Sequence, residues 1–485
     1  MTQVPQPGQT FCHPPFSQWR ELAATQYGAI YPFDALRKSW RGEVAYIAAR
    51  YTASLGLSVP EIGTATPLVM SGHQPNLYHP GVIYKYRLLA RMAEQGFSAI
   101  NLNVDTDVCE GFPVKLPAYN GGYHKVAHYL SPHAVKSFYC DVATDRAALE
   151  IFAQNAVCDL EGVPGNIFGS GVDFLRNEFS RELPEKLADA TVSLRRRYAK
   201  DWPGNVLEAP LSEICKTAQF FDFAFSLLQR GMELAGIFNA SLERYRLEHK
   251  LRYPANPFPN LAQGPAGVET LFWLVKGDAR ATLAVAESGN GIRLAGEEAE
   301  IKDGAGLMAF FIERGYRLWP KAVTLSVINR LYLSDLFIHG IGGAKYDRIT
   351  DEVIEGFYGL TPPVFAVASA TLAVEGLDDP LAHLMELKQK MRETDFHPEQ
   401  YLENPPRDLL ELKEKLLEQI KIPGADKKMI GKNLSEINEK LKLLLAPFKA
   451  ALSAQIAEAE KDLHRRQTLA DRELPFFLYP PTAIP

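Results

Sequence analysis

The chain has 485 residues, of which 46% are hydrophobic and 23% charged, a composition typical of a globular protein with two or three domains. Its formal net charge of −6 at pH 7 argues against nucleic acid or an anionic membrane as the main partner, because such binding depends on clustered basic charge. We therefore expect a soluble protein whose partner is a small-molecule substrate, with no membrane association.

The cysteines and the amino terminus indicate a reducing compartment. The five cysteines are widely spaced and form no C-x-x-C pair, so neither a zinc site nor a disulfide framework is expected. The amino-terminal stretch is proline-rich and polar, unlike a signal peptide, and no apolar run reaches the ~20 residues of a membrane helix. The sequence thus predicts a cytoplasmic protein without a metal site.

Residues 1–115 contain the first predicted elements. We expect a loose arm and helices over 1–65, and then the first part of a Rossmann-like core over 66–115. Within that core, "PLVMSG" (67–72) predicts a buried strand, "GVIYKYRLLARMAEQG" (81–96) a helix and "FSAINLNVDTD" (97–107) a second strand. Such a unit has a right-handed crossover and binds ligands at the carboxyl ends of its strands.

Residues 116–315 are expected to form an inserted α+β region. Its stretch 192–236 has a helical pattern, and 269–298 predicts β-hairpins with a "GNG" turn. The core then resumes over 316–379. There we expect "AVTLSV" (322–327) to be a strand, followed by a helix, the turn "HGIGG", another helix and the strand "VFAVASATL" (364–372).

Residues 380–485 have leucines at three- and four-residue spacing among Lys and Glu, which predicts a helical coiled coil reversed at "IPGAD" (422–426). Such helices often form dimer interfaces, so we expect a homodimer. The predicted fold class is therefore α/β: a Rossmann-like parallel sheet with an inserted α+β region and a carboxyl-terminal coiled coil.

The turn between the first predicted strand and helix is the first candidate site. Gly72 permits close backbone approach, His73 and Gln74 offer donors and acceptors, and Lys85 adds charge near a helix start that could hold a phosphate. The alternative is that the turn only satisfies buried backbone groups and that Lys85 points to solvent. The full set of candidate ligand-binding residues in this turn is Ser71, Gly72, Gln74, Asn76, His79, Gly81 and Lys85, with His73 as a candidate catalytic residue.

The second candidate site follows the next strand. Asp105 and Asp107 are two residues apart, so on a strand they would share a face. Paired carboxylates at a strand end suit a ribose hydroxyl, a magnesium ion or a general base. The alternative is an Asx-turn or a helix cap.

The third candidate site is "HGIGGAKYD" (339–347). Gly342 and Gly343 would allow a ligand to approach the backbone, while Lys345 and Tyr346 follow at a helix start and Arg330 lies upstream. The spacing differs from that of the phosphate loop G-x-x-x-x-G-K-[ST], so the pattern is weak by itself. The alternative is a plain helix-to-helix turn.

Several of these segments together resemble one family. "SGHQ" (71–74), "HPG" with "IYK" (79–85), "DTD" (105–107), "IGG" (341–343) and "SATL" (369–372) are similar, in the same order, to motifs of the BshC family, the cysteine-adding enzymes of bacillithiol biosynthesis. The "HQPN" run also resembles the opening of the WbqC-like family, over the first turn only. Relative to the BshC pattern, His73 replaces a glutamine and Thr106 a histidine.

The resemblance implies a fold similar to class I aminoacyl-tRNA synthetases and a ligase that adds cysteine, or a similar amine, to a sugar-malate-type carboxylate. ATP or another adenine nucleotide, with Mg²⁺, would be the cofactor. Lys85 would stabilise phosphate charge, while His73, Asp105 and Asp107 would be catalytic. Two alternatives stay open: a non-catalytic nucleotide or metabolite binder of the same fold, and a coiled-coil scaffold.

Overall fold

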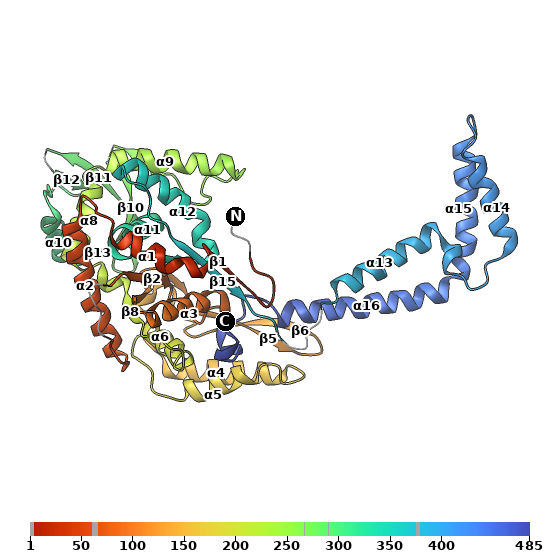
Figure 1. The fold of residues 1–485 in the computed structure, drawn as a ribbon, viewed down its shortest axis with the longest axis horizontal. Coiled ribbons are helices and arrows are strands. Elements are labelled where there is room, and N and C mark those ends of the chain that lie inside the picture. The colour runs from red at the N-terminus through yellow and green to blue at the C-terminus, as the bar shows by residue number, and fades with distance from the viewer. Residues whose placement is uncertain (1–3, 61–65, 266, 290, 375–378) are drawn as a thin grey trace. The chain divides into compact units, whose positions relative to one another are not determined.

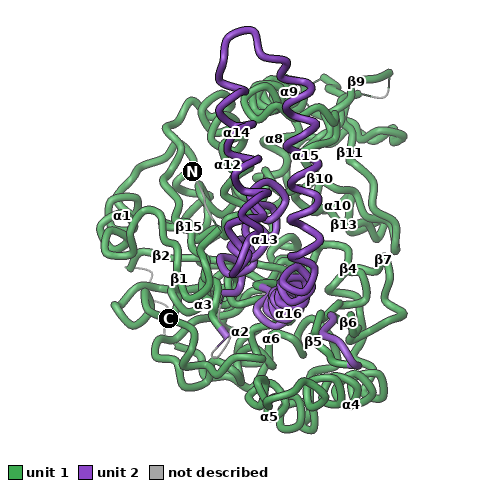
Figure 2. The backbone as a smooth tube through the Cα atoms, turned by 90° about the vertical axis from the view of Figure 1, so that its right-hand side faces the viewer, with its two compact units in different colours: residues 1–119, 125–373, 472–485 green, residues 120–124, 374–471 purple. Residues whose placement is uncertain are grey.

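The computed structural model describes residues 4–60, 66–265, 267–289, 291–374 and 379–485 (Figure 1). The chain divides into two compact units, which Figure 2 shows in different colours. Unit 1 comprises residues 1–119, 125–373 and 472–485, and unit 2 comprises residues 120–124 and 374–471. The fold is mixed α/β, as the sequence predicts.

A six-stranded mixed sheet lies at the centre of unit 1, with strand order β1-β15-β14-β2-β3-β8. The strands β15, β14, β2, β3 and β8 run parallel, and β1 pairs antiparallel with β15. Their bounds are β1 (Gln9–His13), β2 (Leu68–His73), β3 (Ser98–Asn103), β8 (Leu207–Pro210), β14 (Leu336–His339) and β15 (Ala366–Thr371). The parallel strands bring their carboxyl ends to one edge, where ligands of such sheets bind.

The predicted strand–helix–strand unit over 67–107 is confirmed. It consists of β2, α3 (Pro80–Glu94) and β3. All six residues of β3 are buried, as an apolar run in the middle of a parallel sheet requires. Pro80 occupies the first turn of α3, where its missing N–H costs no hydrogen bond, and Gly96 ends the segment with a φ of 90°.

The prediction of a strand at 322–327 is wrong. These residues form helix α11 (Ala322–Val327), which continues into a π-helical turn over Ile328–Leu333. The sheet strand is β14, which pairs with both β2 and β15. A short apolar run has no distinctive period, so the pattern alone did not separate a buried helix from a buried strand.

The amino-terminal arm is more ordered than predicted, because β1 forms an edge strand of the sheet. Its helices α1 (Trp19–Tyr27) and α2 (Asp34–Ser54) follow, the second at the position predicted. From α2, Arg37 and Arg41 reach the buried carboxylate of Asp335 with N···O distances of 2.8 and 2.9 Å. Asp335 also accepts the backbone N–H of Leu68, so this ion cluster ties the starts of β14 and β2 together.

The inserted region contains a second, antiparallel sheet and also one strand of the central sheet. The predicted hairpins are β10 (Gly267–Lys276), β11 (Ala279–Ser288) and β12 (Gly291–Leu294), while Asn290 of the predicted turn lies outside the described residues. Strand β13 (Tyr316–Pro320) pairs with β10, so it belongs to this sheet and not to the core that was expected to resume at 316. The helical pattern over 192–236 corresponds to parts of four helices, but the short strand β8 lies between them and joins the central sheet beside β3, which was not expected.

The other elements of the first 373 residues surround these two sheets (Figure 1). The strands are β4 (Val108–Glu110), β5 (Pro113–Tyr119), β6 (Tyr123–Tyr129), β7 (Val135–Phe138) and β9 (Gln263–Gly264). The helices are α4 (Arg146–Gly162), α5 (Gly169–Phe179), α6 (Leu187–Tyr198), α7 (Leu211–Ile214), α8 (Ala218–Leu228), α9 (Gly231–Glu248), α10 (Gly304–Glu313) and α12 (Ile341–Val353). One apolar core connects both sheets, with Trp40, Phe220, Phe223 and Phe272 at its centre.

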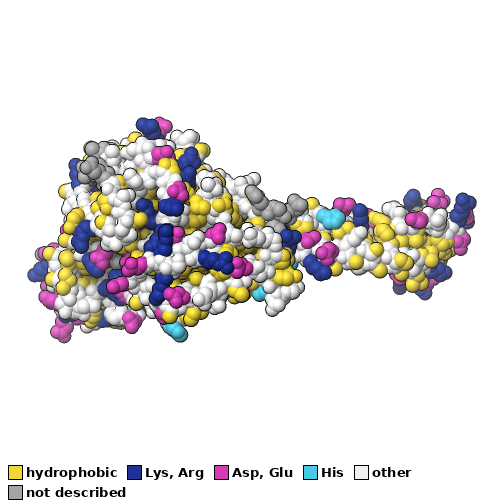
Figure 3. Space-filling view, turned by 90° about the horizontal axis from the view of Figure 1, so that it is seen from below, with side chains coloured by type: hydrophobic (Ala, Val, Ile, Leu, Met, Phe, Trp, Pro, Cys, Tyr) yellow, Lys and Arg dark blue, Asp and Glu magenta, His cyan; other side chains and the backbone are white. Residues whose placement is uncertain are grey.

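Unit 2 consists mainly of four amphipathic helices, α13 (Leu381–Phe396), α14 (Arg407–Gln419), α15 (Lys427–Leu444) and α16 (Ala446–Leu469). Two apolar clusters hold them: Leu384 and Leu387 of α13 with Leu452 of α16, and Leu416 of α14 with Leu441 of α15. The predicted reversal at 422–426 separates α14 from α15. Figure 3 shows apolar side chains exposed among Lys and Glu on these helices.

Among the helices that the structure describes, none combines the length and the apolar character that a bilayer crossing requires.

Candidate functional site

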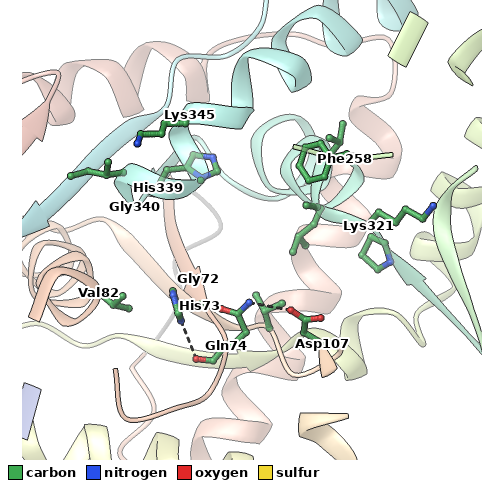
Figure 4. Close-up of a pocket in the computed structure, with 18 of the residues that line it drawn as sticks. Gly72, His73, Gln74, Val82, Asp107, Phe258, Lys321, His339, Gly340 and Lys345 are labelled. Carbon is green, nitrogen blue, oxygen red and sulfur yellow. Dashed lines mark hydrogen bonds between the residues drawn. The ribbon is translucent and has the colours of Figure 1, made fainter. Parts of the chain in front are cut away.

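A cavity of about 790 Å³, which we call the main cavity, opens at the carboxyl ends of β2 and β14. Figure 4 shows Gly72, His73, Gln74 and Asp107 on one side of it, and His339, Gly340 and Lys345 on the other. Ten of the predicted site residues line the main cavity: Gly72, His73, Gln74, His79, Gly81, Lys85, Asp107, Gly342, Gly343 and Lys345. The early turn, the loop after β3 and the late glycine turn therefore converge on one space.

The early turn presents a neutral histidine to the main cavity. Burial, with a contribution from the nearby charge of Lys85, lowers the pKa of His73 to about 3, so its ring is uncharged near neutral pH. The ring packs edge-on against Tyr78 with centroids 5.2 Å apart. A Cβ on Gly72 would lie 3.1 Å from the Leu102 carbonyl, which explains why the strand end carries a glycine.

Lys85 projects from the second turn of α3 and is only 4% exposed. Its ammonium donates to the carbonyl of Gly72 at 2.8 Å, and burial lowers its pKa to about 8. The start of α3 itself is capped, because the N–H of Gly81 donates to Nδ1 of His79. Of the alternatives for Lys85, the structure therefore rules out the solvent-facing one.

The late turn places an uncapped helix start at the main cavity. No side chain caps α12, whose first residues are Ile341, Gly342 and Gly343. A Cβ on Gly342 would meet nothing within 4 Å, so this backbone faces open space. Unpaired N–H groups at a helix start favour anions. The third site is thus a strand-to-helix turn, and not the helix-to-helix turn of the alternative.

A buried ion cluster stands behind the last residue of β14. Nε2 of His339 lies 3.2 Å from Oδ2 of Asp347, and Nη1 of Arg330 donates to the same oxygen at 2.6 Å. Although burial opposes ionisation, His339 and Arg330 hold the pKa of Asp347 below its usual range. The carboxylate also accepts a hydrogen bond from Ser326. Asp347 therefore orients the His339 ring at the cavity wall.

His339 was not among the predicted site residues, although its stretch "HGIGG" was. A histidine directly after a buried strand and before a glycine turn is the signal that could have found it. Arg330 was predicted to bind the ligand, but it lines neither the main cavity nor the smaller space that adjoins this cavity. Its guanidinium donates instead to the carboxylates of Asp347 and Asp351. Arg330 is a positioning residue.

The wall contributed by the second sheet was not anticipated. Arg280 of β11 donates to Oδ1 of Asp107 at 3.1 Å, and its guanidinium lies 4.4 Å from the ring centroid of Trp273. Lys321 lies 4.5 Å from the same ring centroid and donates to Oγ1 of Thr282 at 3.0 Å. Burial lowers the pKa of Lys321 to about 8. Sequence distance hid Arg280, which belongs to the insertion, and Lys321, which directly follows β13 of the same second sheet.

The two aspartates of "DTD" do not act as a pair. Asp105 is 5% exposed, does not line the main cavity and accepts hydrogen bonds from both the backbone N–H and the hydroxyl of Ser212. Burial raises its pKa to about 6, against the effect of those hydrogen bonds. Asp107 alone reaches the main cavity, where it also accepts from Gln74 at 3.2 Å. The chain turns after Asn103, so the strand alternation behind the prediction no longer applies.

Three other predicted ligand-binding residues lie outside the lining of the main cavity. The Ser71 hydroxyl donates to the carbonyl of Ile338, and Oδ1 of Asn76 accepts the N–H of Leu77. Tyr346 lines a smaller adjoining space instead. Ser71 and Asn76 thus fulfil the local structural role that was the alternative for this turn.

The main cavity carries an excess of positive charge. Five cationic side chains line it, against the carboxylates of Asp107 and Glu473. The cations are Lys85, Arg280, Lys321, Lys345 and Arg472. Together with the uncapped start of α12, this excess suits a ligand with several negative charges.

The described residues contain no group of three or more His, Cys, Asp or Glu side chains that could hold a metal ion. No protein-family model matches the chain, and no curated protein matches it.

Proposed function

We propose that the protein is a ligase of the BshC type, which uses an adenine nucleotide to join cysteine, or a similar amine, to a sugar-malate-type carboxylate. The observation that carries the proposal is the cationic cavity at the carboxyl ends of parallel strands, with the open start of α12 in its wall. A nucleotide brings the phosphate charge that such a cavity neutralises. The choice of amine and acceptor rests on the resemblance to the BshC family.

In this proposal the cavity residues divide into holding and proton-transfer groups. Lys85, Lys345 and the N–H groups of α12 hold phosphate charge, and Asp107 would contact a Mg²⁺ ion that accompanies the phosphates only if that ion replaced Arg280 or Gln74 as its partner. The amine nitrogen forms the C–N bond to the activated carboxyl carbon, and the C–O bond to the phosphate-bearing leaving group breaks. His339, oriented by Asp347, accepts the amine proton.

The wider organisation belongs to the same proposal. The central sheet would act as a Rossmann-like nucleotide-binding core, and the helices of unit 2 as a coiled coil that forms a homodimer in the cytoplasm.

A protein that binds a nucleotide or metabolite without turnover is the second candidate. It is favoured by one observation, that Asp105 is turned away from the main cavity and leaves no carboxylate pair there. A scaffold role for unit 2 would require neither a nucleotide nor a metabolite in the main cavity.

The test combines binding with turnover. Purified protein is incubated with ATP, Mg²⁺, cysteine and a sugar-malate acceptor, product is detected by mass spectrometry, and ATP binding is measured by calorimetry. We expect an amide product, and we expect His339→Gln to lower kcat by a factor of about 10² or more while ATP binding persists.

His128→Gln is the matched control. His128 also contacts an aspartate, Asp159, at 2.8 Å, but it does not line the main cavity, so its loss is expected to leave kcat unchanged. ATP binding without product, in the presence of every co-substrate, would favour the non-catalytic binder. Absence of ATP binding would contradict both nucleotide proposals.

A further inference from the structure

A smaller space, which we call the inner chamber, adjoins the main cavity and has a volume of about 190 Å³. Gly72, Phe337, His339 and Gly343 line both spaces, so the two lie side by side. Gly342 and Lys345 line only the main cavity. An elongated ligand whose charged end lies beside α12 would therefore have the inner chamber next to its other end.

The walls of the inner chamber are mostly apolar. Leu102 and Val104 from the central sheet, Val323 and Leu325 from α11, and the rings of Phe258 and Phe337 contribute to them. A charged group would lose its hydration there without a counter-charge, because the nearby carboxylate of Asp347 is already bound by Arg330 and Ser326. The chamber suits an uncharged, flat or apolar group.

Two side chains that line this chamber have a buried polar atom without a hydrogen-bond partner among the described residues: Asn329, through Oδ1, and His339, whose Nε2 lies 3.2 Å from Oδ2 of Asp347. Asn329 lines the chamber and is 2% exposed, and its Oδ1 has no hydrogen-bond partner among the described residues. A buried amide without a partner costs free energy, so such groups usually mark a place where another molecule completes the hydrogen bonds. Asn329 also lies in the π-helical turn after α11, a geometry that is frequent at functional sites.

We propose that the inner chamber is a base-recognition pocket for adenine, in which the Asn329 amide reads the purine edge. This inference rests on the proposed function, since it assigns an orientation to the nucleotide: base in the inner chamber, phosphates beside Lys345 and the start of α12. An Asn amide pairs with adenine by accepting from the N6 amino group and donating to N7. Guanine presents two acceptors at the same edge, so it leaves the amide oxygen unpaired.

Calorimetry on the full chain at pH 7.5 tests the proposal with three ligands: ATP, GTP and inorganic tripolyphosphate. We expect ATP to bind at least about tenfold more tightly than either of the others, since a pocket built for a donor rejects an analogue that lacks it. Asn329→Leu, which keeps the side-chain volume, is expected to bring the ATP affinity to that of tripolyphosphate. Its tripolyphosphate affinity is expected to stay unchanged.

Two further variants complete the test. Leu325→Trp narrows the chamber from a partly buried position that also borders the main cavity, without removing a buried polar group, and is expected to give the same loss of ATP preference while tripolyphosphate still binds. Thr371→Val is the matched control, because Thr371 is 4% exposed and its Oγ1 also lacks a partner among the described residues, but it lines neither space. Its three affinities are expected to equal those of the unmodified protein.

The possible results separate this inference from the proposed function. Equal affinities for ATP, GTP and tripolyphosphate, or an ATP preference that survives in both Asn329→Leu and Leu325→Trp, would overturn the adenine pocket. If the adenine pocket is overturned in this way, a loss of tripolyphosphate and ATP affinity in Lys345→Met would still support a phosphate site in the main cavity. If none of the three ligands binds, the proposed nucleotide use fails together with the inference.

Discussion

Among single residues, Lys85 is the one whose burial is expected to affect the binding of an anionic ligand most directly. Its ammonium is buried beside the sheet end and donates to the Gly72 carbonyl, yet none of the carboxylates that the structure describes forms an ion pair with it. Desolvation of an ammonium without a counter-charge favours its neutral form, which is why its pKa falls to about 8. An anionic ligand would supply the missing charge. Binding and protonation of Lys85 are therefore expected to be coupled.

The coupling predicts proton uptake when ATP binds above pH 8. In the free protein a large part of Lys85 is then neutral, and binding favours the ammonium, so affinity falls as the pH rises through 8. Titration calorimetry at pH 8.5, in buffers of different ionisation enthalpy, measures the protons taken up. Lys85→Met is expected to reduce the uptake, and the remainder would belong to Lys321, whose pKa is also lowered to about 8. Equal uptake with and without Lys85 would contradict this coupling.

Among the secondary-structure elements, α12 is the one whose start would hold the phosphates in the proposed function. It follows β14 directly, no side chain caps it, and its second residue is Gly342 with open space around it. Glycine within a helix usually destabilises it relative to alanine. A glycine here has a physical purpose if a ligand must approach the backbone closely.

Replacement of Gly342 separates these two effects. Gly342→Ala is expected to raise the free energy of unfolding by up to ~1 kcal/mol, from helix propensity, while it weakens ATP binding about tenfold or more because a methyl group enters the ligand space. Chemical denaturation and calorimetry measure the two quantities. Gly42→Ala in α2 is the matched control, since a Cβ there also meets nothing within 4 Å, and only stability should change. Unchanged ATP binding in Gly342→Ala would place the phosphates elsewhere.

At the scale of the whole molecule, unit 2 exposes several large apolar side chains on its helices. Leu443 and Leu444 at the end of α15 are 77% and 52% exposed, and Met429 at its start is 57% exposed. Scattered apolar side chains are normal on a surface, but several of them on amphipathic helices favour a partner helix. The proposed homodimer would bury them.

The dimer proposal predicts a mass change on substitution. Sedimentation analysis of the unmodified protein is expected to give twice the chain mass of 54.0 kDa, and the variant Leu443→Glu with Leu444→Glu is expected to give a single chain. Two carboxylates in an apolar interface would be desolvated without partners, whereas on an exposed helix surface they cost little. The variant should keep its helix content by circular dichroism. A single-chain mass for the unmodified protein would refute the dimer.

Local pattern was sufficient for some parts of this protein. The β2–α3–β3 unit, the hairpins of the second sheet and the helical character of unit 2 follow from residue periodicity and from glycine and proline positions, which act within one element. For the same reason the sequence located the early turn with Gly72, His73 and Lys85, and the late turn with Gly342 and Lys345. The residues next to one another in the sequence determine where a strand ends and where a helix begins.

Only the tertiary structure decided which side chains share a space. It turned Asp105 toward Ser212 and left Asp107 at the main cavity, replaced the predicted strand at 322–327 by a helix, and brought Arg280 from the insertion to the site. It also aligned His339 with Asp347 eight residues later, across a turn whose course no local period encodes. The physical reason is that residue types and their periodicity specify individual helices and strands. Whether two side chains from distant parts of the sequence face each other depends on how those helices and strands pack.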